Sequence, residues 1–292
     1  MRHLFIINPQ AGKGKTKEII LMKEKACKKE SVDYIIEFTK RVGHAKEIAK
    51  EYTSKEAMRV YSVGGDGTLN EVLNGMAESD SSLAVIPSGS GNDFIRSITD
   101  KEDLEEILTS SIKSEFELVD LGKCNEKYFI NIASVGLDAE IVYNSIKLKR
   151  LPFIPSKFAY LLSIFTTVFG YKSKKLNIQL DDKNIYEKTL LTAVANGKYY
   201  GGGMKVAPRA ELCDGSFEIC HVKEASPFKI IRLFPRLIKG VHDTIKEVTF
   251  YKGKKIKIEC EEEMSVNIDG ELFRAKDISL EILPKAIRIV RP

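Results

Sequence analysis

Glycine-dense turns stand where apolar runs of this sequence end, and such turns are suited to phosphate binding. The densest is Gly64-Gly65-Asp66-Gly67-Thr68-Leu69-Asn70. Glycine lets the backbone approach a ligand closely, and the N-terminus of the helix expected next offers free N–H groups and a positive dipole end. Asp66 could hold Mg²⁺ or order the nucleotide; the alternative is a purely structural turn.

Two more loops and one residue are expected at the same sheet edge, because loops at the carboxyl ends of parallel strands line one crevice. They are Asn8-Pro9-Gln10-Ala11-Gly12-Lys13-Gly14-Lys15-Thr16, Pro87-Ser88-Gly89-Ser90-Gly91-Asn92-Asp93 and Thr39. The first nearly matches the P-loop pattern, but Pro9 stands where that pattern needs glycine, which excludes a P-loop NTPase. Together these loops predict a nucleotide site.

Two carboxylates near the end of the chain, Asp269 and Glu271, flank Gly270 after a β-rich run. If both point into one cleft, one could accept a hydroxyl proton while the other orients the hydroxyl or a metal. The alternative is an ordinary Asp-Gly hairpin turn.

Alternating strand and helix patterns up to about residue 121 predict a parallel sheet with helices on both faces. The expected strands are 4–7, 34–38, 59–63 and 83–86, and the expected helices are 15–29, 43–52, 68–76 and 101–109. We therefore expect an α/β nucleotide-binding domain over residues 1–121.

Later in the chain, β-rich runs follow one another and predict an antiparallel sandwich over residues 122–284, which would bind the substrate. Its expected strands are 127–134, 176–180, 189–195, 216–222, 247–251, 254–259, 264–268 and 278–283. One helix is expected over 156–169, and a last strand, about 285–292, could return to the first domain.

The composition indicates a folded protein, since the 292 residues are 43% hydrophobic and 30% charged, with only 20 Gly and 9 Pro. Five cysteines without a C-x-x-C pair, and four histidines, argue against a disulfide framework or a zinc site and favour a reducing cytosol. The N-terminal apolar run and the stretch 158–170 are too short for a signal peptide or a membrane-spanning helix. We expect a cytoplasmic protein.

Positive charge is concentrated in two segments that are also rich in apolar residues. Residues 141–180 and 225–240 contain no acidic residue, against a net charge of +5 for the whole chain. Basic charge beside exposed apolar side chains fits an anionic lipid surface. The alternative is core-facing helices with solvated lysines; nucleic acid is not expected, because no recognised binding motif accompanies the charge.

The sequence resembles the soluble diacylglycerol kinase catalytic-domain family, which is related to sphingosine and ceramide kinases. The resemblance covers essentially the whole chain. It rests on Asn8-Pro9, on the 64–71 turn, and on residues 87–94, 131–140, 196–208 and 269–271. Ser90 stands where the family usually has Thr.

The resemblance implies residue roles. ATP would lie between the domains on residues 64–70 and on the 8–12 loop, with Thr39 and Ser90 nearby. Glu271, with Asp269 beside it, would act as base on a lipid hydroxyl, and Asp66 would belong to the catalytic set. Mg²⁺ would neutralise charge during in-line transfer, and a second, structural Mg²⁺ would bind Asp214 and, through backbone carbonyls, Glu211 and Ser216.

We therefore expect an ATP-dependent lipid kinase that converts diacylglycerol to phosphatidic acid, acting peripherally at the inner face of the membrane. The alternatives are an NAD kinase-like enzyme with a soluble acceptor and a non-catalytic nucleotide- or membrane-binding regulator. Exposed strand edges are compatible with a homodimer.

Overall fold

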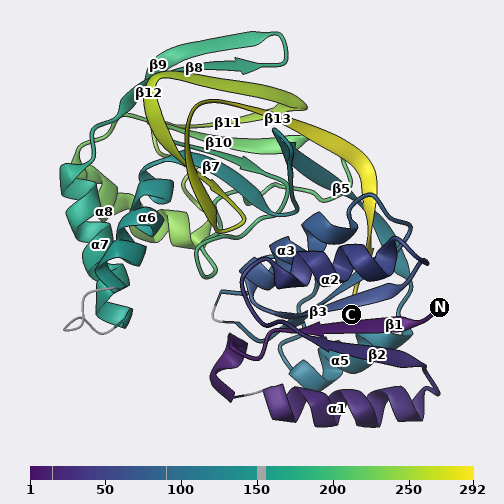
Figure 1. Cartoon of the computed structure of the whole chain (residues 1–292). Coiled ribbons are helices and arrows are strands. Elements are labelled where there is room, and N and C mark those ends of the chain that lie inside the picture. Colours follow the sequence, from purple (N-terminus) through teal and green to yellow (C-terminus); the bar gives the residue numbers. More distant parts are fainter. Residues whose placement is uncertain (15, 90, 150–155) are drawn as a thin grey trace.

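The structure, a computed structural model, describes residues 1–14, 16–89, 91–149 and 156–292. It has an α/β lobe and a β-rich lobe, and both chain termini lie in the α/β lobe (Figure 1).

The α/β lobe is built on four parallel strands in the order β4-β3-β1-β2. They are β1 (His3–Ile7), β2 (Tyr34–Phe38), β3 (Arg59–Gly64) and β4 (Ser82–Pro87). The helices of this lobe are η1 (Ala11–Gly14), α1 (Thr16–Lys29), α2 (His44–Thr53), α3 (Asp66–Met76), α4 (Ile95–Ile98) and α5 (Leu104–Lys113). Helices α2 and α3 cover one face of the sheet and α1 and α5 the other (Figure 1), which is why every residue of β1 is buried.

The β-rich lobe contains mostly antiparallel strands. They are β5 (Phe116–Cys124), β6 (Lys127–Phe129), β7 (Ile132–Gly136), β8 (Lys174–Leu180), β9 (Lys183–Ala195), β10 (Phe217–Lys223), β11 (Val248–Gly253), β12 (Lys255–Ile268) and β13 (Glu271–Val290). Three helices, α6 (Leu137–Lys149), α7 (Ser156–Gly170) and α8 (Pro227–Lys239), lie together at one side of this lobe (Figure 1).

Strand β13 joins the two lobes. It begins in an antiparallel pair with β12, and near its end Arg288 and Ile289 pair in parallel with Ser82 and Leu83 of β4. The strand expected after residue 284 is therefore the end of β13, and it lies in the α/β lobe. Strand β5 pairs with β13 on both sides of Leu121, so the domain boundary expected there lies within a strand.

The β-rich lobe becomes sandwich-like because its long strands bend. The register of β12 with β13 shifts between Glu259 and Met264, and the strand pairs with β8 before the shift and with β7 after it. An irregularity of this kind lets one strand contribute to two layers. The strands predicted separately over 254–259 and 264–268 are thus one strand, and so are those predicted over 278–283 and about 285–292.

Other differences from the sequence-based expectations concern long-range contacts. The single strand predicted over 127–134 is divided into β6 and β7, because the backbone N–H groups of Ile130, Asn131 and Ile132 donate to Asp269. Strand β5 and helix α6 were not predicted, and the sequence identified α8 only as a basic and apolar segment.

Candidate active site

The three glycine-rich loops of the α/β lobe meet at the carboxyl ends of β1, β3 and β4, as expected. The Asn8 side-chain amide donates to Thr68 Oγ1 at 3.0 Å, and the Ser88 N–H donates to the Gly64 carbonyl at 2.9 Å. A Cβ atom added to Gly89 would lie 2.5 Å from the Gly65 Cα. Glycine is therefore required where two of the loops touch.

The other residues predicted to bind ATP lie around these contacts. Pro9, Gln10 and Ala11 lead from β1 into η1, and Gly12, with φ +72°, lies so close to the third loop that a Cβ would be 2.5 Å from the Ser88 carbonyl oxygen. The Thr39 N–H donates to the Ile7 carbonyl at 2.9 Å, which places Thr39 at the same sheet edge. Ser90 lies outside the described residues.

Helix α3 leaves its N-terminal N–H groups available to a ligand. Its N-cap is Gly65, which has no side chain to accept from them, and Gly67, Leu69 and Asn70 lie in its first turns. Unpaired N–H groups at a helix N-terminus favour phosphate.

Asp66 is fixed by the third loop. Its Oδ1 accepts from the Asp93 N–H and its Oδ2 from the Asn92 N–H, both at 2.8 Å. A Cβ on Gly91 would lie 2.4 Å from Asp66 Oδ2. The carboxylate therefore has a single defined position at the base of the cleft.

Asp93 is a site residue to which the sequence analysis assigned no role. Its carboxylate accepts from the N–H groups of Gly202, at 3.0 Å, and Gly203, at 2.7 Å, and so connects the two lobes. Burial raises the pKa of Asp93, and the nearby charge of Asp66 raises it further. The available signal was the run Gly201-Gly202-Gly203, whose positive φ angles expose backbone N–H groups to a carboxylate.

Asp269 combines the two alternatives considered for it, because it occupies a hairpin turn and also faces the cleft. Asp269 and Gly270, with φ of 46° and 93°, form the two-residue turn between β12 and β13. The Asp269 carboxylate accepts from the N–H groups of Ile130 and Ile132, each at 2.8 Å. Burial raises the pKa of Asp269 to about 6 against the effect of these donors, and Asp66 adds to the rise.

Glu271 is oriented differently from Asp269. Its Oε2 lies 2.6 Å from Lys127 Nζ in a half-exposed ion pair. Glu271 is paired across the hairpin with Ile268, and side chains of paired residues share one face of a sheet whereas successive residues alternate. Because Asn267 lines the cleft, Ile268 and Glu271 point to the opposite face. The base role predicted for Glu271 stays a prediction.

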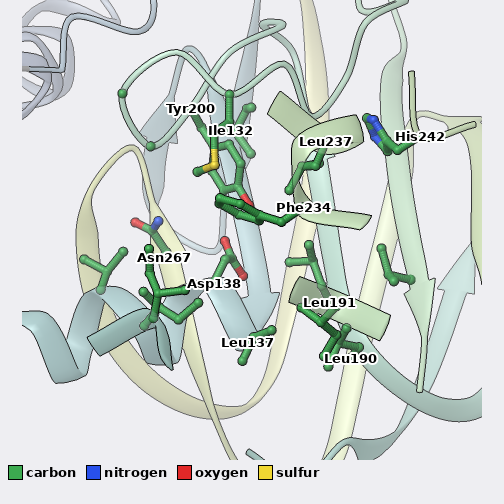
Figure 2. Close-up of a pocket in the computed structure, with 18 of the residues that line it drawn as sticks. Ile132, Leu137, Asp138, Leu190, Leu191, Tyr200, Phe234, Leu237, His242 and Asn267 are labelled. Carbon is green, nitrogen blue, oxygen red and sulfur yellow. The ribbon is translucent and has the colours of Figure 1, made fainter. Parts of the chain in front are cut away.

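A cavity of about 690 Å³ connects these carboxylates with an apolar compartment. Asp66, Asp93 and Asp269 all line it. Most of the remaining lining is apolar and comes from β9 and from helices α6, α7 and α8, with Leu191, Leu137, Val168 and Phe234 as examples. Figure 2 shows several of these side chains pointing into one space. Such a cavity suits a ligand that has a polar end and one or more hydrocarbon chains.

The carboxylates of the cleft are hard oxygen ligands of the kind that Mg²⁺ prefers. No group of three acidic, His or Cys side chains gathers around one point in the described part of the chain. Mg²⁺ commonly takes one or two carboxylates together with substrate phosphates. Asp66, Asp93 and Asp269 are therefore suited to an ion that arrives with a nucleotide.

The predicted structural Mg²⁺ site has a lysine beside its main ligand. Asp214 Oδ2 lies 2.7 Å from Lys252 Nζ, and Oδ1 accepts from the Ser216 N–H and hydroxyl, both at 3.0 Å. Glu211 lies close enough to raise the pKa of Lys252. The donor chemistry fits Mg²⁺, but the ion would have to displace the Lys252 ammonium; this site stays a prediction.

The fold and site define a class: an α/β lobe joined through a shared strand to a sandwich-like lobe that carries an apolar cavity. A family model for the diacylglycerol kinase catalytic domain matches residues 2–124. A model for the YegS C-terminal NAD kinase beta sandwich-like domain matches residues 131–291. The chain belongs to the diacylglycerol kinase catalytic-domain family and has a YegS-like C-terminal domain.

Individual relatives agree with this assignment. A diacylglycerol kinase of Bacillus subtilis (strain 168) is 30% identical over 92% of this chain and 89% of its own length. A diacylglycerol kinase of Staphylococcus haemolyticus (strain JCSC1435) is 32% identical over 91% of this chain and 81% of its own. The crystal structure of a candidate diacylglycerol kinase from Bacillus anthracis (strain Sterne) superposes with a TM-score of 0.82 at 27% identity, covering all of this chain and 95% of the other.

Proposed function

We propose that this protein is an ATP-dependent lipid kinase whose acceptor is diacylglycerol or a related lipid, with phosphatidic acid as the product from diacylglycerol. The observation that carries the proposal is the cavity in which Asp66, Asp93 and Asp269 share a lining with the apolar side chains of α6, α7 and α8. A soluble acceptor such as NAD would leave these apolar walls facing water.

The proposed reaction assigns a role to each part of the site. The three loops and the uncapped end of α3 bind the triphosphate, and the lipid chains occupy the apolar compartment. The lipid hydroxyl oxygen attacks the γ-phosphorus, the bond to the β-γ bridging oxygen breaks, and ADP leaves. As the family resemblance implies, the hydroxyl proton passes to Glu271, with Asp269 beside it; this role requires the Glu271 side chain to turn from the opposite face of the hairpin toward the cleft. Mg²⁺ bound with ATP near Asp66 would reduce the charge repulsion between the phosphates and these carboxylates.

The test is a kinase screen with γ-labelled ATP over diacylglycerol, other hydroxyl lipids and NAD, each offered to the purified protein in mixed micelles. We expect label in a chloroform-soluble product. Label only in NAD phosphate, or in no acceptor at all, would refute the proposal.

To take up a membrane lipid, the protein must bring the cavity close to a bilayer. Helices α7 and α8 expose apolar and basic side chains that suit contact with a bilayer. No residue of α8 is fully buried, although Ile230, Ile231 and Leu237 pack against buried core clusters, so one face of this helix meets the core-facing alternative and the other is exposed. Phe228 of α8 is 77% exposed and contacts Phe169 of α7, which is 53% exposed. Arg232 and Lys239 supply positive charge on the same helix. No described helix is long and apolar enough to cross a membrane.

We expect the double variant Phe169→Asp/Phe228→Asp to bind anionic vesicles about tenfold or more less tightly, since each buried Phe is worth about 1.5–3 kcal/mol. The measurement is co-sedimentation with phosphatidylglycerol vesicles at low and high salt, and wild-type binding should weaken with salt. Val42→Asp is the matched control, because Val42 is 90% exposed on the α/β lobe. Equal sedimentation of the double variant and the control would contradict docking through these helices.

A further inference from the structure

Asp138 carries a carboxylate into the apolar part of the cavity. Asp138, the second residue of α6, lines the cavity together with Leu137, Leu191 and Phe234, and Figure 2 shows its carboxylate pointing into the space between them. An acidic side chain is unusual in a compartment suited to hydrocarbon chains, because a carboxylate away from water is unfavourable unless it is paired.

Only one of the two oxygens of the Asp138 carboxylate has a hydrogen-bond partner among the described residues. Its Oδ2 accepts from the Ser134 hydroxyl, whereas its Oδ1 is buried and has no hydrogen-bond partner among the described residues. Unpaired buried carboxylate oxygens are uncommon in folded proteins, and each calls for a specific explanation.

Positive charge on the described residues does not provide that explanation. The ammonium group of Lys229, which also lines the cavity, lies 2.6 Å from Glu247 instead. The backbone N–H groups of Ala139 and of Asp138 itself favour the charged form, but burial outweighs them and raises the pKa of Asp138 to about 6. In its ionised form the carboxylate can only accept hydrogen bonds.

Asp138 and Asp269 accept hydrogen bonds from nearby positions of β7, and we expect the lipid hydroxyl that is phosphorylated to lie beside Asp269. Strand β7 carries both contacts: the Ile132 N–H donates to Asp269, and the Ser134 hydroxyl donates to Asp138. Two residues of a strand span about 7 Å. Two hydrogen bonds of about 3 Å each and a few covalent bonds of a lipid headgroup can cover that separation.

We propose that Asp138 determines acceptor specificity: it selects lipids that carry a second hydrogen-bond donor a few bonds from the hydroxyl that is phosphorylated. Two kinds of lipid have such a donor, namely a monoacylglycerol, with its second hydroxyl, and an N-acyl sphingoid lipid, with its amide N–H. Diacylglycerol has ester oxygens there, which are acceptors and would leave Asp138 Oδ1 unpaired. The inference rests on the proposed lipid kinase function.

The experiment compares three lipids of matched acyl length in mixed micelles: 1-monoacylglycerol, ceramide and 1,2-diacylglycerol. The proteins are wild type, Asp138→Leu, which keeps the number and branching of the side-chain heavy atoms without polar atoms, and Asp138→Asn, which keeps a neutral acceptor. Leu190→Ala is the control, since Leu190 lines the same cavity and should affect all three lipids alike. The readouts are kcat/KM and, without ATP, the shift in melting temperature that each lipid causes.

We expect wild type to favour the donor-bearing lipids at least tenfold, Asp138→Leu to reduce that ratio tenfold or more, and Asp138→Asn to give an intermediate ratio. A ratio unchanged within twofold in Asp138→Leu, in both readouts, would overturn the inference while leaving the kinase proposal intact. If wild type phosphorylates no lipid, the kinase proposal fails. The melting shifts then decide the inference: a donor-dependent shift that Asp138→Leu abolishes supports it, and any other pattern refutes it.

Discussion

Glu271→Gln should lower the turnover number about 10²–10⁴-fold, the usual contribution of a positioned general base, and should leave ATP affinity nearly unchanged. The variant keeps the shape of the side chain and removes its ability to accept a proton. The measurements are steady-state kinetics with diacylglycerol and nucleotide binding by calorimetry.

The ion pair between Glu271 and Lys127 allows a second test of the role of Glu271. Glu271 Oε2 lies 2.6 Å from Lys127 Nζ, so the carboxylate must leave that ammonium before it reaches a substrate hydroxyl. Lys127→Met removes the partner without changing Glu271, and it should reduce turnover by much less than Glu271→Gln does. Glu126→Gln is the matched control, because Glu126 belongs to the adjacent turn and its side chain is 95% exposed.

Asp269 is the competing base, and the two carboxylates can be distinguished experimentally. Asp269→Asn leaves fewer acceptor oxygens for the backbone N–H groups of residues 130–132, so it should lower the melting temperature as well as the activity. Near-normal turnover in Glu271→Gln, together with a folded but inactive Asp269→Asn, would reject Glu271 as the base and assign the role to Asp269.

Local sequence signals were sufficient to predict that the three glycine-rich loops meet at one sheet edge. Three of the short apolar strands, 4–7, 59–63 and 83–86, lead into glycine- or proline-containing turns, and the carboxyl ends of neighbouring parallel strands must lie at one sheet edge. The convergence of Asn8, Gly64 and Ser88 therefore follows from the strand pattern alone. The contacts between Asn8 and Thr68 and between Gly64 and Ser88 are the structural result.

The junction of the lobes could not be predicted in this way, because its contacts join residues far apart in the chain. Asp93 accepts from Gly202 and Gly203, which no periodicity relates to it. Asp269 divides a predicted strand by binding its backbone N–H groups, and the cavity exists only where α6, α7 and α8 come together. Asp138 falls within the 131–140 stretch on which the resemblance rests, but no pattern there predicts a buried carboxylate oxygen without a hydrogen-bond partner.

Asp66→Asn should lower kcat/KM for ATP by about 10³-fold or more. An amide has one acceptor oxygen, so one of the two N–H groups now bound by Asp66, those of Asn92 and Asp93, would face an N–H donor instead. Loss of a hydrogen bond to a charged group costs about 1.5–3 kcal/mol, which is roughly tenfold to a hundredfold. We attribute the remaining part of the loss in kcat/KM to the removal of a negative charge from a site suited to Mg²⁺ and ATP. Asp80→Asn is the control, since Asp80 is exposed and pairs with Arg288 in the same lobe.

Gly91→Ala tests the same carboxylate without changing its charge. The added Cβ would lie 2.4 Å from Asp66 Oδ2, so either the carboxylate or the loop must shift. If activity requires the position of Asp66 as well as its charge, Gly91→Ala should lose at least tenfold in kcat/KM while the melting temperature falls by only a few degrees.

Full activity in Gly91→Ala combined with an inactive Asp66→Asn would show that charge alone matters. Activity within threefold of wild type in both variants would remove Asp66 from the catalytic set. Among the described acidic side chains, only Asp66 accepts from the N–H groups of both Asn92 and Asp93, so no other one takes over its position.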